Sequence, residues 1–79
     1  MSHSTQERLV YMANQIGKFF ASQGHDAAVT GVAAHISKFW DPRMRAQIFA
    51  HLSEHAGAGL DPNVKEAIEL LAHKSDAGV

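Results

Sequence analysis

The residues best spaced for chemistry are His51, Glu54 and His55, which match the pattern H-x-x-E-H. Two histidines four positions apart share one face of a helix and can bind zinc, with the glutamate as a general base. A catalytic zinc also needs a third protein ligand, ordered hydrogen bonds around the ligands and a dry cavity, for which this chain has little volume. We therefore expect His51 and His55 to flank a buried stripe and to face partly outward, and we predict no metal site.

Other catalytic patterns are missing from the 79 residues. There is no glycine-rich phosphate loop, no G-x-S-x-G turn and no pair of carboxylates in an apolar setting. The absence of cysteine excludes disulfides, thiolate zinc sites and cysteine-bound iron–sulfur clusters, and it suits a reducing cytosol. We predict a chain without catalytic or cofactor-binding residues of its own.

The size and charge of the chain exclude further classes of partner. Seven basic residues against eight acidic ones leave a net charge of −1, too small a field to hold nucleic acid. No run approaches the roughly 18 apolar residues of a membrane span, and the first residues lack the apolar stretch of a signal peptide. We expect a cytoplasmic protein with one domain over residues 1–79, ordered over about 4–74 and followed by a frayed tail at 75–79.

The first expected helix starts at Ser4, which forms a capping box with Glu7. It runs to about Ser22, and Gly24 is expected to end it as a left-handed cap. A second helix is expected after Asp26 as its N-cap, with Gly31 as a tolerated weak point. Apolar residues recur three and four apart in both segments, as a buried helix face requires. They are Leu9, Met12, Ala13, Ile16, Phe19 and Phe20 in the first, and Val29, Val32, Ala33, Ile36, Phe39 and Trp40 in the second.

Two Asp-Pro pairs, at 41–42 and 61–62, predict the starts of a third and a fourth helix. Aspartate is a good N-cap, and proline suits the first helical position. We expect the third helix to fade into a flexible exit at 56–59 and the fourth to end near His73 and Lys74. Their apolar residues are Met44, Ile48, Phe49 and Leu52, then Val64, Ala67, Ile68 and Leu71. The fold class is therefore all-α, a small bundle of about four short helices.

A candidate docking surface lies at residues 38–45, where large aromatics, a methionine and basic residues surround one helix junction. Tryptophan, phenylalanine, methionine and arginine are enriched in protein interfaces. Arg43 and Arg45 fall in the first turn of a helix, where the dipole disfavours a cation by about 0.3–1 kcal/mol each, so another group should offset that cost. Alternatively, Arg45 lays its stem on Trp40 and Arg43 points to solvent. The expected partner contacts here are Phe39, Trp40, Arg43, Met44 and Arg45.

Asn14 and Gln15, in the middle of the first helix, are either solvent-facing or hydrogen-bonded to another chain. We include both among the expected partner contacts. Val10 and Tyr11 widen the apolar face of the same helix, either toward the core or as a patch left for a partner.

Several strings in the chain together resemble the delta subunit of soluble NAD-dependent formate dehydrogenases over roughly residues 8–72. They are Met12-Ala13-Asn14-Gln15-Ile16-Gly17, Phe19-Phe20, His35-Ile36, Phe39-Trp40-Asp41-Pro42-Arg43-Met44-Arg45 and Gly59-Leu60-Asp61-Pro62. The resemblance implies a cytoplasmic complex that oxidises formate and passes electrons to NAD. It also implies that the molybdenum or tungsten pterin, the iron–sulfur clusters, the FMN and the NAD belong to larger subunits.

The implied role of the delta chain is that of a non-catalytic accessory subunit, which supports assembly or stability by contact with the larger subunits. The alternative is a freestanding helical binding module or maturation factor that associates only transiently.

Overall fold

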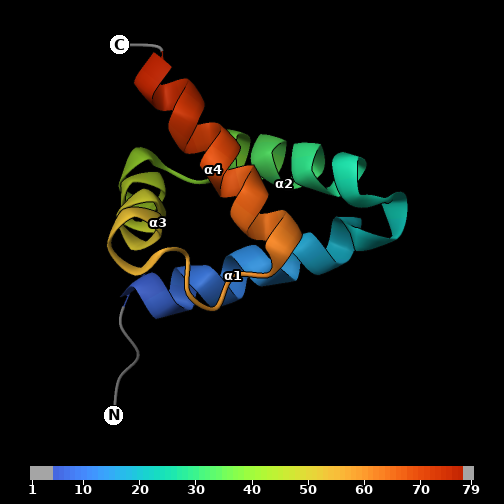
Figure 1. Ribbon diagram of the computed structural model, residues 1–79, viewed down its shortest axis with the longest axis horizontal. Coiled ribbons are helices and arrows are strands. Elements are labelled where there is room, and N and C mark those ends of the chain that lie inside the picture. The colour runs from blue at the N-terminus through green and yellow to red at the C-terminus, as the bar shows by residue number, and fades with distance from the viewer. Residues whose placement is uncertain (1–4, 78–79) are drawn as a thin grey trace.

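In the part of the chain that the structure describes, the fold consists of four α-helices and one short 3₁₀ helix (Figure 1). The structure is a computed structural model that describes the backbone of residues 5–77 and the side chains of residues 5–74. In chain order the elements are α1 (Thr5–Phe20), η1 (Ala21–Gln23), α2 (His25–Phe39), α3 (Pro42–His55) and α4 (Pro62–Ala77). The predicted all-α class is confirmed, since the described residues contain no strand.

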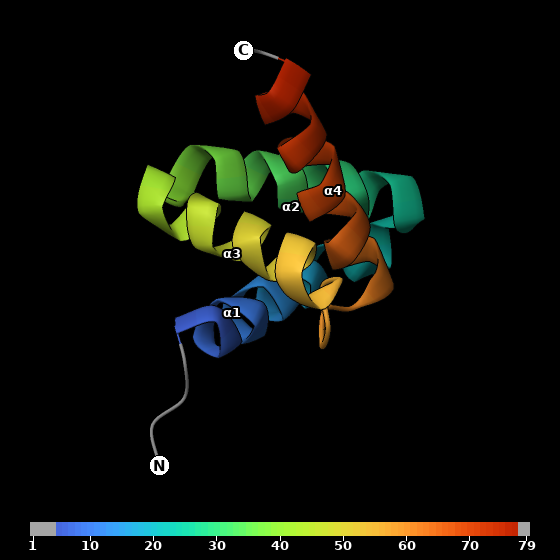
Figure 2. The ribbon, with the colours of Figure 1, turned by 60° about the vertical axis from the view of Figure 1, so that its left-hand side comes forward.

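The helices pack in a simple arrangement. α1 and α2 run antiparallel, α3 lies at one end of this pair, and α4 crosses over it (Figures 1 and 2). As a result α1 and α2 each contact α4, and α1 also contacts α3. The end of α2 and the beginning of α1 lie at the same end of the molecule.

The core is built from the predicted apolar stripes, with three exceptions. Its buried members are Leu9, Ala13, Val29, Val32, Ala33, Ile36, Trp40, Ile48, Val64, Ala67 and Ile68. Met12, Phe19 and Phe39 were expected in the stripes but are exposed. In α1 the reason is angular, because Met12 and Phe19 lie roughly 100–120° around the helix from Ala13. The other helices cover a narrower arc of α1 than the sequence pattern implied.

The Asp-Pro prediction is confirmed at the start of α3. Asp41 is the N-cap, its Oδ1 accepts a hydrogen bond from the Met44 amide at 2.8 Å, and Pro42 is the first helical residue. α4 likewise begins at Pro62, and the Asp61 carbonyl accepts the Lys65 amide at 2.8 Å. Ser4, the expected cap of α1, lies outside the described residues.

The passage from α1 to α2 differs from the prediction. α1 ends at Phe20 and is followed by η1, and Gly24 has φ 97° and ψ 161°, a positive φ without left-handed helical geometry. α2 begins at His25 with Gly24 as its N-cap, so the predicted cap at Asp26 is wrong. Asp26 instead lies in the first turn of α2, where its charge suits the positive end of the helix dipole.

Two glycines allow close contacts between elements. A Cβ on Gly31 would come within 2.7 Å of the Phe20 ring, so this position is a packing requirement rather than the weak point expected from the sequence. A Cβ on Gly17 would overlap with Val64 Cγ2, where α1 meets α4. Both contacts need a residue without a side chain.

The α3–α4 connection, residues 56–61, is a hydrogen-bonded turn, and the flexibility expected for residues 56–59 remains a prediction. Ala56 ends α3 in the left-handed conformation, with φ 55° and ψ 29°. The Ala58 amide donates to the His55 carbonyl, and the Leu60 amide donates to the Gly57 carbonyl, both at 3.0 Å. The following α4 continues to Ala77, beyond its expected end near His73 and Lys74.

Candidate functional site

The α2–α3 junction, residues 38–45, uses several of its side chains inside the fold. Trp40 is 5% exposed and belongs to the core, and Met44 packs against that core. Phe39 is 67% exposed, with its ring centroid 4.7 Å from that of His35, and Arg43 is also exposed. Phe39 and Arg43 are therefore the predicted contacts at this junction whose side chains face solvent.

Arg45 caps the end of α2. Its Nη1 donates to the Ser37 and Trp40 carbonyls, each at 2.9 Å. These carbonyls lie at the negative end of the α2 dipole, where a cation is favourable. The unfavourable position of Arg45 in the first turn of α3 is thus offset within the chain itself. This role could not be predicted from the sequence because the two carbonyls precede Arg45 by eight and five residues, at the end of the preceding helix and at its C-cap.

Asn14 anchors the α3–α4 connection to α1. Its Nδ2 donates to the Gly59 carbonyl, and its Oδ1 accepts from the Asp61 amide, both at 2.9 Å. The structure therefore shows a third role, an internal one, beside the solvent and partner roles considered from the sequence. The only sequence signal was a helix-disfavouring Asn in mid-helix. The neighbouring Gln15 is exposed.

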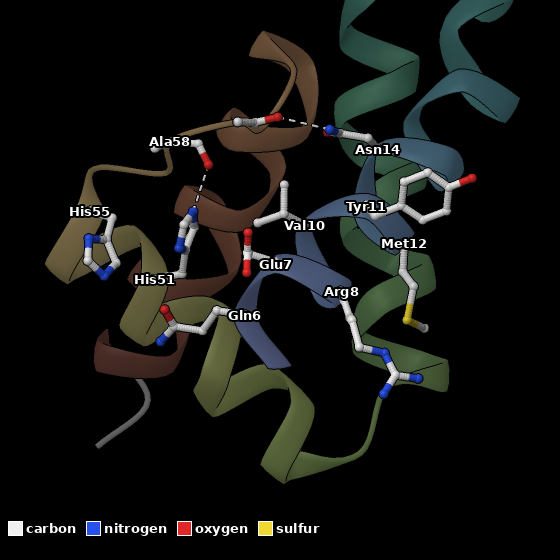
Figure 3. A pocket seen from close by; sticks show the side chains of 11 residues that line it. Gln6, Glu7, Arg8, Val10, Tyr11, Met12, Asn14, His51, His55 and Ala58 are labelled. Carbon is white, nitrogen blue, oxygen red and sulfur yellow. Dashed lines mark hydrogen bonds between the residues drawn. The ribbon is translucent and has the colours of Figure 1, made fainter. Parts of the chain in front are cut away.

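His51 is 8% exposed, so the expectation that it faces partly outward is wrong, whereas His55 is exposed. The His51 Nε2–H donates to the Ala58 carbonyl at 2.8 Å (Figure 3), while its buried Nδ1 has no partner. The two histidine ring centroids are 5.4 Å apart. Among the residues that the structure describes, no group of three histidine, aspartate or glutamate side chains is placed to hold a metal ion.

A hollow of about 1060 Å³ adjoins the N-terminal half of α1. His51, His55 and Ala58 contribute to its lining, together with residues of α1 that include Tyr11 and Met12. Figure 3 shows His51 on one side of α1 and Met12 on the other. The hollow therefore extends along α1 rather than forming a closed chamber.

Large apolar side chains are exposed on α1 in particular. Tyr11 is 66% exposed, Phe19 74% and Met12 41%; outside α1 the corresponding residues are Phe39 and Leu70. Val10, by contrast, is partly buried against the core. Of the two interpretations of this pair, Val10 therefore follows the core-facing one, and Tyr11 belongs to an exposed patch.

An ion pair joins α2 to α4 on the surface. His25 Nε2 contacts the Glu66 carboxylate, and both side chains are more than half exposed. A pair this exposed contributes little to stability because water screens the charges. Within the described part of the chain, no helix has the length and apolar character needed to cross a membrane.

Fold and site together define a small all-α domain whose polar anchors are directed inward, while Tyr11 and Phe19 on α1 are directed outward. The family model of the NADH-dependent formate dehydrogenase delta subunit, FdsD, matches residues 8–68. The chain belongs to this family, and membership implies that other subunits of the dehydrogenase are its partners. Neither the curated proteins nor the solved structures gave a match.

Proposed function

We propose that the chain is a non-catalytic accessory subunit of a cytoplasmic NAD-dependent formate dehydrogenase, and that it supports assembly or stability by contact with the larger subunits. The observation that carries the proposal is the family match over residues 8–68. On this proposal the molybdenum or tungsten pterin, the iron–sulfur clusters, FMN and NAD are held by the larger subunits.

The contacts of the candidate residues support this role. Asn14, His51 and Arg45 all direct polar atoms to backbone groups of the same chain, which is the use expected of structural residues. With the exception of Leu70, the large exposed apolar side chains of the described residues are aromatic residues or methionine, which are enriched in protein interfaces.

The α2–α3 junction is the first proposed contact, through Phe39 and Arg43. Arg43 lies in the first turn of α3, where the helix dipole disfavours a cation by about 0.3–1 kcal/mol. A carboxylate or carbonyl group of a larger subunit would offset that cost on binding. Trp40, Met44 and Arg45 hold the junction in place through contacts within the chain.

Arg43→Ala tests this contact in the complex assembled with the other subunits. If Arg43 is buried at a hot spot, its loss weakens binding by about 2 kcal/mol, or roughly thirtyfold. Formate turnover per assembled metal centre should stay unchanged. The matched control is Lys74→Ala, which removes an exposed cation from the last turn of α4 and should leave binding intact.

The results separate the possible roles. Equal binding by Arg43→Ala and the parent chain removes Arg43 from the interface. A collapse of turnover while the chain stays bound contradicts the non-catalytic role. A parent chain that is found with assembly intermediates but not in the finished dehydrogenase supports the maturation factor instead.

A further inference from the structure

We propose that the outer face of α1 is a second docking surface, which receives an apolar patch with acidic groups at its ends on a larger dehydrogenase subunit. This inference rests on the proposed function and names a contact region for it. The outer face of α1 consists of Arg8, Tyr11, Met12, Gln15, Lys18 and Phe19.

These residues form one continuous stripe. They recur three and four apart, as residues on one helix face do, and from Arg8 to Phe19 they span about 16 Å at 1.5 Å per residue. All six are exposed, although two aromatics and a methionine would be expected inside a protein of this composition. The described residues of α2, α3 and α4 leave this side of α1 uncovered.

The exposed apolar area of this face is comparable to that of functional surface patches on other proteins. An aromatic side chain buries about 200 Å² when fully covered, so the exposed fractions of Tyr11 and Phe19 alone amount to about 280 Å². The largest apolar patch on a typical monomer is about 300–600 Å² and is often functional. Met12 and the adjoining hollow extend the patch further, and the hollow can receive a side chain of the partner.

The charges of this face indicate the kind of partner. Its ionised residues, Arg8 and Lys18, are both cations and lie near its two ends. If two copies of the chain paired through this face, cations would meet cations whether the helices ran parallel or antiparallel. Acidic groups on a larger subunit would instead complement the cations at both ends. They would also offset the unfavourable interaction of Arg8 with the helix dipole in the first turn of α1.

The main test replaces the two aromatics with glutamine, a good helix former, in the double variant Tyr11→Gln and Phe19→Gln. Binding to the complex of the other subunits is measured by titration with the parent and variant chains. We expect the double variant to bind at least roughly thirtyfold more weakly, as hot-spot aromatics do. Its helical circular dichroism should match that of the parent, because both side chains are exposed.

Leu70→Gln is the matched control, since Leu70 is also an exposed apolar residue but lies on α4. It should bind like the parent chain. A second variant, Arg8→Glu, should weaken binding about tenfold. The same change should keep or raise the melting temperature of the isolated chain, because glutamate suits the first turn of a helix.

Three results overturn the inference. The double variant binds as tightly as the parent, or Leu70→Gln weakens binding equally, or the isolated parent chain is a dimer that the double variant dissociates. In the last case a second copy occupies the face. A parent chain that binds none of the other subunits overturns the proposed function itself, and the parent titration shows this before any variant is compared.

Discussion

The two connections on either side of α3 differ in where their side-chain anchors come from. At the α2–α3 junction, the helix start is made by neighbours in the chain, with Asp41 bonded to the amide of Met44 and Arg45 bonded to carbonyls within eight residues. The α3–α4 connection has two local backbone hydrogen bonds, but its side-chain anchor is remote, because Asn14 binds the backbone of Gly59 and Asp61, 45 and 47 residues away.

The two kinds of anchor stabilise their connections at different stages of structure formation. A local cap forms together with its helix and needs no other element. A remote anchor needs the packed tertiary structure, so its removal should expose whether the α3–α4 connection is ordered by its own residues or by α1. Variants in the two regions test whether the two connections differ in this way.

The largest effect is expected from Trp40→Ala. Replacing this buried aromatic leaves a cavity at the α2–α3 junction and should lower the free energy of unfolding by about 3–5 kcal/mol. A domain of this size has little more stability than that, so urea titration should find the isolated variant largely unfolded. The neighbouring Phe39→Ala, at an exposed position, should change stability by less than about 0.5 kcal/mol. Similar losses for both would contradict the burial difference.

Asn14→Ala should rank second. It removes two hydrogen bonds from the α3–α4 connection and should cost about 2 kcal/mol in urea unfolding. Hydrogen exchange at the Asp61 amide should become faster than global unfolding allows, while the amides of α2 keep their protection. Gln15→Ala is the control and should be nearly neutral. An unchanged Asp61 amide would mean that the connection is ordered by its own residues.

Arg45→Ala should have a smaller effect of about 1 kcal/mol, since it removes the cation that caps the exposed end of α2. Amides at the end of α2 should exchange faster, which nuclear magnetic resonance can measure residue by residue. Arg43→Ala removes an equal charge from the same first turn of α3, but Arg43 does not bond to those carbonyls, so the change should leave the exchange unchanged. Equal fraying in both variants would assign the effect to charge alone.

Ala56→Gly should have the smallest effect, and a stabilising one. Ala56 adopts a left-handed conformation that costs a non-glycine residue about 1–2 kcal/mol, part of which glycine loses again through the entropy of the unfolded chain. We expect a net gain of about 0.5 kcal/mol in thermal unfolding. Ala58→Gly, at a position without positive φ, should destabilise instead. A loss of stability in both variants would show that the entropy glycine adds to the unfolded chain outweighs any relief of backbone strain in the α3–α4 connection.

Features set by neighbouring residues could be predicted from the sequence. The starts of α3 and α4 follow from the two Asp-Pro pairs, and the buried stripes of Ile48 and Ile68 follow from their spacing. The predicted start of α2 was wrong because aspartate is a favoured N-cap residue, whereas the N-cap in the structure is Gly24, two residues earlier.

Features set by contacts between separate elements of the fold could not be predicted. The burial of His51 depends on its bond to Ala58 in the following turn. The need for glycine at position 31 depends on where Phe20 arrives. Phe19 and Phe39 fit the apolar period of their helices but are exposed, because the period does not determine how much of each helix surface its neighbours cover. The seven expected partner contacts remain a prediction, of which Gln15, Phe39 and Arg43 have exposed side chains.

The Asn14 anchor also bears on how long the folded chain lasts. The bonds from Asn14 join residues that are 45 and 47 positions apart in the chain, so they close a long loop. Because closing a long loop costs conformational entropy, we expect these bonds to form only after the intervening helices have assembled. Contacts that form after the transition state leave the folding rate unchanged and slow unfolding. We therefore expect Asn14 to act as a latch on the lifetime of the folded subunit, which extends the time during which a newly made chain can meet its partners.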